Sequence, residues 1–291
     1  MTFDINKIYR DVKCQDLTPS MYLGCGGAAH IFRVFNASEL SGFTVQFNNF
    51  RALGNGSNVI ISGAGITEPA LKLDGAFRKI SVRGSEVIAG AGSMLKDVIK
   101  KSAAEGLSGL ENLSGIPAAV GGAVFKNAGA FGSSVSDALK WVKFYRGGKE
   151  YKISGKMISA SYRTGPVKIP SVISEVCFSL AKSSKDKILR RIKEIIKMRM
   201  EKGFIYKNGT GCIFKNPAKI SAGKLIAESS CSRFCSGGVS VSPLHANVFI
   251  LGGDRRSEDA YALMNKIRAR VYKKKGVYLE PLVEFWGVFG K

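Results

Sequence analysis

The sequence lacks long apolar runs and an apolar leader. None of its apolar stretches approaches the roughly 20 residues that a bilayer-spanning helix needs, which argues against an integral membrane protein. The N-terminus, MTFDINKIYRDVKCQ, carries acidic residues early and has no apolar core, so it does not look like a signal peptide. We therefore expect a cytoplasmic protein that does not act at a membrane.

Histidine is scarce, and the cysteines are not spaced as metal ligands. The six cysteines form no CxxC pair, and the two histidines are His30 and His245. Structural zinc sites take their ligands from closely spaced cysteine and histidine pairs. We expect no metal site. In a reducing compartment the cysteines are expected to be free thiols.

Acidic residues are few, at 22 against 44 lysines and arginines, and the net charge is +22. Such a charge attracts anions, whether nucleic acid, an acidic membrane surface or small phosphorylated ligands. The alternative is a lysine-rich solvated surface, since the basic residues are dispersed along the whole chain. The sequence has no basic tail and no zinc-finger or RNP-type motif. We therefore expect small anionic ligands and no nucleic-acid partner.

A chain of 291 residues allows two or perhaps three domains with sizeable cores. Alternating patterns predict strands over 137–155, around a Gly-Gly hairpin turn. Apolar residues at i, i+4 and i+7 predict an amphipathic helix over 184–202 with a basic polar face. Further helices are predicted over 94–105 and from Ser257 to a stop at Gly276.

Glycine is abundant, and it is concentrated in the nearly uncharged stretch 106–132, GLSGLENLSGIPAAVGGAVFKNAGAFG. No regular helix or strand pattern runs through this stretch. Glycine lets the main chain approach a ligand closely, and successive backbone amides can form concave nests for anions. The stretch therefore indicates an anion site. The alternative is a tightly packed loop with no ligand.

A second glycine-bearing turn, GNGSN at 54–58, lies between two short apolar strands. No helix is predicted after it, so it is neither a P-loop nor a dinucleotide fingerprint of the Rossmann type. Its amides and hydroxyls could still meet a phosphate. The alternative is an ordinary turn, because asparagine, glycine and serine are the usual turn residues.

These two stretches belong to a longer series of motifs in a fixed order. LGNGSNVII and the glycine-rich stretch are followed by SYR, GCIFKNP, HAN and a terminal strand that begins with LE. From about residue 17 to 287 the chain resembles the UDP-N-acetylenolpyruvoylglucosamine reductase family. The match to GIPxxxGGAxxxNAGAxG together with FKNP is the specific part, since no single motif would suffice.

The resemblance implies an α+β protein. Its FAD-binding domain would be of the vanillyl-alcohol-oxidase (PCMH) type, with two subdomains at 1–66, including an N-terminal arm, and 67–182. A C-terminal α+β domain at 183–291 would bind the substrate. The short segment between SYR and the helix near 184 resembles the subtype that lacks an extra substrate-capping insertion.

By matching positions, the family's FAD site would comprise both glycine-bearing segments. The residues carried over are Gly54, Gly56, Ser57, Asn58, Gly115, Ile116, Pro117, Gly121, Gly122, Asn127, Ala128 and Gly129. This agrees with the reading of the residues themselves, because these are the two places where backbone amides could meet a diphosphate.

The family's reaction has two halves, in which NADPH reduces the flavin and the reduced flavin then reduces UDP-N-acetylglucosamine enolpyruvate to UDP-N-acetylmuramate for peptidoglycan. Arg163 in SYR matches the family's arginine, whose charged fork can bind a carboxylate; the alternative is a surface arginine. Lys215, Asn216 and His245 fall on substrate-binding motifs. A monomer is expected.

Three departures from the family pattern bear on catalysis. Cys212 replaces the family's proton-donating serine; a thiol is the better acid, although Cys212 could instead be a small buried hydrophobe. Leu282 replaces the glutamate that serves as the family's catalytic acid. On a strand over 277–287, Glu280 and Glu284 would share its face and either could substitute, or both could be ordinary polar positions.

The third departure is SCSR at 230–233 in place of a GLKG-like turn, where Arg233 would supply the lost lysine charge one place along. FAD binding is therefore better supported by the sequence than catalysis is. We take Arg163, Cys212 and Glu280 as the candidate catalytic residues. The competing reading is a degenerate flavoprotein of the same fold, with weak or altered activity.

Overall fold

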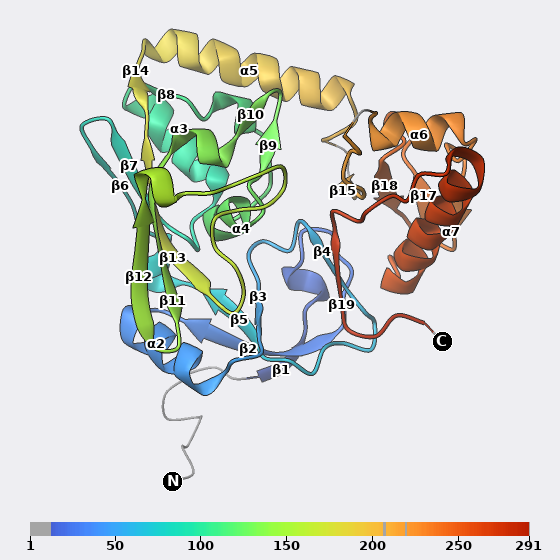
Figure 1. Ribbon diagram of the computed structural model, residues 1–291, viewed down its shortest axis with the longest axis horizontal. Helices are drawn as coiled ribbons and strands as arrows, with labels where there is room; N and C mark the ends of the chain where they lie inside the picture. Colours follow the sequence, from blue (N-terminus) through green and yellow to red (C-terminus); the bar gives the residue numbers. More distant parts are fainter. Residues whose placement is uncertain (1–12, 206–207, 219, 291) are drawn as a thin grey trace. The chain divides into compact units, whose positions relative to one another are not determined.

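The computed structural model describes residues 13–205, 208–218 and 220–290 (Figure 1). The chain separates into two compact units, the first of residues 1–14, 30–55 and 68–196 and the second of 15–29, 56–67 and 197–291. Most of the predicted N-terminal arm, residues 1–12, lies outside the described residues. No helix in the described ranges is long and apolar enough to cross a bilayer.

The first unit contains a small parallel arrangement, in which β5 (Ala70–Leu73) pairs with β2 (Ala28–Val34) and β3 (Arg51–Ala52). The sheet order is β1-β2-β5-β3, with β1 at Lys13–Asp16. Helix α2 (Ala37–Gln46) closes over an aromatic core, where the rings of Phe43 and Phe32 meet edge to face with centroids 5.4 Å apart.

The larger part of this unit is a five-stranded antiparallel sheet, ordered β12-β11-β13-β7-β6. Helices α3 (Leu95–Ala104) and α4 (Val120–Phe125) pack on it over one continuous apolar core (Figure 1). The strands are β6 (Ile80–Arg83), β7 (Glu86–Gly90), β11 (Leu139–Arg146), β12 (Lys149–Ser154) and β13 (Val172–Ser179). Two ribbons complete the unit, β8 (Leu107–Ser108) with β14 (Ala181–Lys182) and β9 (Gly129–Ala130) with β10 (Ser133–Ser134).

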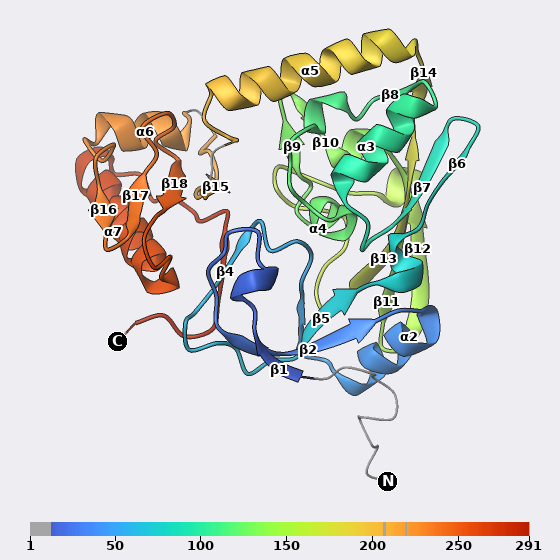
Figure 2. The same cartoon turned by 180° about the vertical axis from the view of Figure 1, so that it is seen from behind.

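The second unit is built around the antiparallel sheet β15-β18-β17-β16, against which α6 and α7 pack (Figure 2). Its elements are β15 (Gly209–Cys212), β16 (Cys235–Ser236), β17 (Val239–Val241), β18 (Val248–Leu251), α6 (Ala222–Glu228) and α7 (Ser257–Lys275). A separate parallel pair joins β4 (Val59–Ile61) to β19 (Glu284–Trp286). Helix α5 (Lys185–Glu201) begins in the first unit and ends in the second.

The longer predicted elements are confirmed. α3, α5, α7 and the β11–β12 hairpin all form, and Gly276 ends α7 in the left-handed conformation at φ +66°. The closing strand is shorter than predicted and begins only at Glu284. The prediction of no regular helix in the glycine-rich stretch is wrong, because α4 forms there. Helix α2 was not predicted at all.

Candidate functional site

The glycine-rich stretch is held against the sheet by backbone bonds at the start of α4. Val120 and Gly121 donate to the carbonyls of Ser93 and Ala91, each at 2.8 Å. A Cβ on Gly121 would lie only 3.0 Å from that of Ala91, so packing explains this glycine. Gly122 is different: it is exposed, and a Cβ there would meet nothing within 4 Å.

Glycine inside a helix costs up to about 1 kcal/mol relative to alanine. At Gly122 the surrounding protein gives no reason for that cost. A ligand that lies close to the backbone would give one. Residues near α4 also adopt the left-handed conformation, with φ of +81° at Gly115 and +43° at the buried Asn127. The stretch therefore offers an open backbone surface that fits an anionic ligand.

Within the first unit, the glycine-rich stretch adjoins Gly54 and Asn55, the first two residues of the GNGSN turn. The side-chain amide of Asn55 donates to the carbonyl of Pro117 at 2.8 Å. A Cβ on Gly54 would lie 3.3 Å from the Cβ of Ala119. Residues 62 positions apart in sequence are thus brought together, as one shared ligand requires. Asn55 makes this bond although the motif comparison did not single it out.

The SYR loop is anchored directly to the same stretch. Asn127 donates from its side chain to the carbonyl of Ser161 at 3.0 Å, and Gly165 donates its N–H to the carbonyl of Phe125 at 2.9 Å. A Cβ on Gly165 would lie 1.9 Å from the carbonyl oxygen of Val124, so only glycine fits. The loop that carries Arg163 is therefore fixed to the end of α4.

Arg163, on this loop, has a side-chain donor with spare hydrogen-bonding capacity. Its Nε is buried and has no hydrogen-bond partner among the described residues. Its backbone is left-handed, with φ +60°, and the guanidinium carbon lies 5.4 Å from the centre of the Tyr162 ring. A buried donor without a partner is costly unless something else accepts its bond. These features are more typical of a ligand-binding arginine than of an arginine on the surface.

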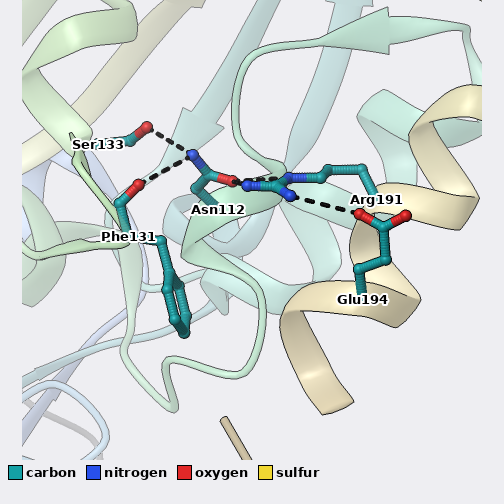
Figure 3. A network of polar contacts seen from close by, with 5 residues as sticks. All are labelled: Asn112, Phe131, Ser133, Arg191 and Glu194. Carbon is teal, nitrogen blue, oxygen red and sulfur yellow. Dashed lines mark hydrogen bonds and ion pairs between the residues drawn. The ribbon is translucent and has the colours of Figure 1, made fainter. Parts of the chain in front are cut away.

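A polar network ties the far end of the glycine-rich stretch to α5 (Figure 3). The Asn112 side chain donates to the carbonyl of Phe131 at 3.3 Å and to the hydroxyl of Ser133 at 2.8 Å. Its Oδ1 accepts two bonds from Arg191, at 3.1 and 2.9 Å, and Arg191 also bonds Glu194 at 3.3 Å. One asparagine therefore fixes both the loop around Phe131 and the start of α5.

The other residues of the GNGSN turn, Gly56, Ser57 and Asn58, belong to the second unit. Gly56 and Asn58 contact residues of that unit. Gly56 has φ +63°, and a Cβ there would lie 2.7 Å from the sulfur of Met21. Asn58 donates from its side chain to the carbonyl of Leu282 at 3.0 Å and accepts the N–H of Glu284 at 3.0 Å. Asn58 thus holds the closing segment of the chain, a structural task beside the predicted cofactor role. Ser57 is half-buried.

Cys212 is half-buried at the end of β15, opposite Val248. The chain just after it pairs with the closing segment, since Leu282 donates its N–H to the carbonyl of Ile213 at 2.7 Å and Lys215 donates to that of Glu280 at 2.9 Å. The structure therefore brings the place of the family's glutamate beside the strand that carries the cysteine.

Three buried thiols, those of Cys25, Cys177 and Cys231, are in surroundings that disfavour the thiolate. Burial raises the pKa of Cys25 to about 11. Burial, with a hydrogen bond to Glu86, raises the pKa of Cys177 to about 12, and burial also raises that of Cys231. None of the six cysteines forms a disulfide.

Both carboxylates considered as substitutes for the missing glutamate already have partners. Glu280 is exposed and lies 2.5 Å from the ammonium of Lys215. Glu284 accepts the indole N–H of Trp286 at 2.8 Å. Since β19 begins at Glu284, the strand alternation used to place Glu280, Leu282 and Glu284 on one face does not extend to Glu280.

The other predicted substrate residues also belong to the second unit. Asn216 accepts the N–H of Ala222 at the start of α6, at 3.0 Å. Arg233 is exposed. Burial lowers the pKa of His245, and the nearby Lys202 adds to this; its Nδ1 accepts the N–H of Asn247 at 3.2 Å. His245 is therefore a neutral imidazole near pH 7, packed with its centroid 4.6 Å from that of Phe204.

Comparison with known proteins gives one consistent result. Residues 41–149 match the model of an FAD binding domain, and residues 204–286 match that of the UDP-N-acetylenolpyruvoylglucosamine reductase C-terminal domain. The reductase of that name from Thermus thermophilus is 34% identical over 246 residues, covering 84% of this chain and 90% of its own. The one from Clostridium beijerinckii is 32% identical and covers 97% and 96%.

The chain belongs to the UDP-N-acetylenolpyruvoylglucosamine reductase family. A crystal structure of the reductase from Thermus caldophilus superposes with a TM-score of 0.85 at 32% identity, covering 95% of this chain and 99% of that one. The resemblance seen in the motifs and the expected α+β fold, with an FAD-binding domain and a C-terminal reductase domain, are confirmed. Between the SYR loop and α5 the reductase chain forms only short loops and the strands β13 and β14.

One residue of the reductase fold that the motif comparison passed over is Asn247, the last of HAN. It is 1% exposed. Its Oδ1 accepts the N–H of Phe214 and its side-chain amide donates to the carbonyl of Phe214, both at 2.9 Å, while its own carbonyl accepts the N–H of Ile213. Asn247 therefore fixes the segment between Cys212 and Lys215. The quoted motif was the available signal, but its partners lie more than 30 residues away.

Replacing Asn247 by alanine should lower the free energy of unfolding by roughly 2 to 4 kcal/mol, because it leaves a buried N–H and a buried carbonyl unpaired. Urea denaturation followed by circular dichroism measures the change. As a control, Asn265→Ala on the half-exposed side of α7 should change it by less than about 0.5 kcal/mol. Equal effects of the two substitutions would contradict the bonding role given to Asn247.

Proposed function

We propose that this protein is an FAD-dependent reductase that uses NADPH to convert UDP-N-acetylglucosamine enolpyruvate to UDP-N-acetylmuramate, a step of peptidoglycan synthesis. The observation that carries the proposal is the first unit's site. Two glycine-bearing segments meet there through Asn55, and Asn127 fixes beside them a loop whose arginine has a buried, unpartnered donor. Family membership supports the same activity.

The residues that would hold FAD belong to the two glycine-bearing segments, where Gly122 has an open backbone and Gly56, Gly115 and Asn127 have a left-handed one. Within the proposed subdomains, 1–66 and 67–182, they are Gly54, Gly56, Ser57, Asn58, Gly115, Ile116, Pro117, Gly121, Gly122, Asn127, Ala128 and Gly129. When bound, FAD supplies the carrier that takes a hydride from NADPH and passes it to the substrate. The residues of the chain would bind and orient the cofactor and the substrate, and would protonate the substrate.

Arg163 would bind the enolpyruvyl carboxylate. Its planar fork can make two parallel hydrogen bonds to a carboxylate, and its charge opposes the negative charge that develops on the substrate's oxygens. The unpartnered Nε shows that at least one of those donors is uncommitted within the described residues. Fixing the loop through Asn127 and Gly165 would keep the fork in place without further reorganisation.

Cys212 would hold, on its Sγ, the proton that the substrate carbon receives after hydride transfer. Cys212 is half-buried, whereas Cys25, Cys177 and Cys231 are buried. The β15 backbone and the Asn247 bonds around Phe214 would fix the position of the thiol. A positioned acid of this kind typically contributes a factor of about 100 to 10,000 in rate.

The proposed substrate domain, 183–291, would bind the UDP-sugar through Lys215, Asn216, Arg233 and His245. Glu280 remains our candidate for the family's missing glutamate, and its ion pair with Lys215, itself a proposed substrate-binding residue, supports this choice. To act on the substrate, the Glu280 carboxylate would leave the Lys215 ammonium and contact the substrate instead. We further propose that the protein is a cytoplasmic monomer.

The first test of this proposal is Gly122→Ala. The added methyl group meets nothing in the protein, so the apoprotein's free energy of unfolding should stay the same or rise by up to about 1 kcal/mol. If FAD lies against this backbone, its affinity should fall at least tenfold. Fluorescence titration of apoprotein with FAD measures the affinity. Unchanged affinity would remove Gly122 from the cofactor site.

The competing proposals make different predictions for the purified protein. A basic nucleic-acid-binding protein would be colourless, whereas a flavoprotein is yellow and absorbs near the flavin maxima. A degenerate flavoprotein would be yellow but would oxidise NADPH no faster when the enolpyruvyl substrate is added. The degenerate flavoprotein has to be tested because Leu282 occupies the position of the family's glutamate.

A further inference from the structure

A cavity in the first unit lies between α3 and α5, and apart from Gly115 its lining residues are not among those assigned to the reaction. It has a volume of about 430 Å³. The apolar side chains of Ile99, Leu189, Ile192 and Ile196 line it, and Ser114 and Gly115 lie at one side. A volume of this size accommodates a small organic ligand.

The cavity is a built feature of the unit, because α5 is fixed on both sides of it. Ile188 and Ile195 are fully buried on the inner face of the helix, at 2% and 0% exposure. Arg191 is bonded twice to Asn112 (Figure 3). Ile192 also packs partly against the main core of the unit. These contacts therefore hold α5 in place and keep the cavity between α3 and α5 open.

The charged side chains at the cavity are all of one sign. Lys96, Lys100 and Lys185 contribute to the lining, and no aspartate or glutamate does. None of the three lysines forms a hydrogen bond or ion pair with the rest of the described chain, whereas neighbouring lysines such as Lys101 are paired. The hydroxyl oxygen of Ser114, which is 4% exposed, is buried without a hydrogen-bond partner.

We propose that this cavity binds an amphiphilic anion, namely an unbranched aliphatic chain that ends in a carboxylate. The isoleucine and leucine side chains would cover the chain, the lysine ammonium groups would bind the carboxylate, and Ser114 would supply a further hydrogen bond. No aromatic ring lines the cavity to stack on a nucleobase. A neutral alkane would make no use of the three exposed ammonium groups and would leave the buried Ser114 hydroxyl without a partner.

This site does not depend on the proposed reductase activity. It adjoins the predicted cofactor segment only through Gly115, so holoprotein with FAD bound should still take the anion. The chemistry could come from a free fatty acid or from another molecule with an unbranched aliphatic chain and a free carboxylate. The probe must therefore carry the carboxylate and the chain and nothing else.

The test is isothermal titration calorimetry of the FAD-loaded protein with sodium decanoate, kept below its micelle concentration. One saturable site is expected. The triple variant Lys96→Gln, Lys100→Gln and Lys185→Gln should weaken binding at least tenfold. The matched control, Lys149→Gln, Lys182→Gln and Lys187→Gln, removes the same charge from exposed lysines outside the cavity and should bind like the parent.

Three further measurements make the result decisive. Decanol, which has the chain without the charge, should bind at least tenfold more weakly than decanoate. Ala104→Phe, at an exposed position on the cavity wall, should block binding without overpacking the core. Absence of saturable binding, equal affinity of the two triple variants, or release of FAD in step with decanoate binding would overturn the proposal. A phospholipid vesicle that binds while decanoate does not would overturn it too.

Discussion

Cys212→Ala is expected to leave reduction of the flavin by NADPH unchanged and to slow the transfer from reduced flavin to the substrate about a hundredfold or more. The reason is that alanine has no proton to give, while the fold around it remains bonded through Ile213 and Phe214. Stopped-flow absorbance separates the two half-reactions. The free energy of unfolding should change by less than about 1.5 kcal/mol, since the side chain is small and only half-buried.

Cys212→Ser is the matched control for this prediction. A hydroxyl has nearly the same size and can also carry a proton, and serine is the residue that the family pattern has at this position. The serine variant should therefore keep the second half-reaction within about tenfold of the parent. If alanine and cysteine give equal rates in that step, Cys212 is only a small side chain that fills space at the end of β15.

Arg163→Lys is expected to have an effect of similar size on the same step. Lysine keeps the charge but replaces the planar fork by a single point donor, so a carboxylate loses its second parallel bond. Losing one such donor typically costs a factor of about 100 to 1,000 in rate. The substitution also leaves the anchors of the loop, Asn127 and Gly165, untouched.

The measurement is again the rate of the second half-reaction, now with the substrate KM determined alongside it. Arg190→Lys on the exposed face of α5 is the control and should behave like the parent. A higher KM with an unchanged rate would mean that Arg163 binds substrate and transition state equally. Unchanged rate and KM together would remove Arg163 from the site.

Much of the fold was predictable because its longer helices have strong patterns. In α5 and α7 the apolar residues recur at helical spacing, and α7 ends at a glycine that is left-handed in the structure. Helix α2 escaped prediction because its sequence, ASELSGFTVQ, contains weak helix formers and exposes Val45 while burying Leu40 and Phe43. Its side-chain cap at Asn36 was the usable signal.

The candidate site was predictable where its requirement is local. A glycine with no room for a Cβ, such as Gly165, or with room that the protein leaves empty, such as Gly122, is visible as a glycine in the sequence. Asn55 and Asn247 were missed because their role is to bond backbone groups far along the chain, at Pro117 and Phe214. No local pattern specifies such partners.

Leu282, which occupies the position of the family's glutamate, shows the same limit of prediction from local sequence. Strand alternation suggested that Glu280 and Glu284 share a face with Leu282, but β19 begins only at Glu284. Around Pro281 the chain instead makes a single bridge to Phe214. Which carboxylate lies near the strand of Cys212 is decided by that tertiary pairing and by the charge of Lys215, neither of which the pattern of residues contains.

The most direct test of the central claim is steady-state oxidation of NADPH by the purified, FAD-loaded protein, followed at 340 nm with and without UDP-N-acetylglucosamine enolpyruvate. If the chain is a working reductase with Leu282 in place of the family's glutamate, oxidation will depend on the enolpyruvyl substrate, and UDP-N-acetylmuramate will form in equal amount. Flavin-loaded protein that consumes NADPH no faster with substrate than without it would contradict the account.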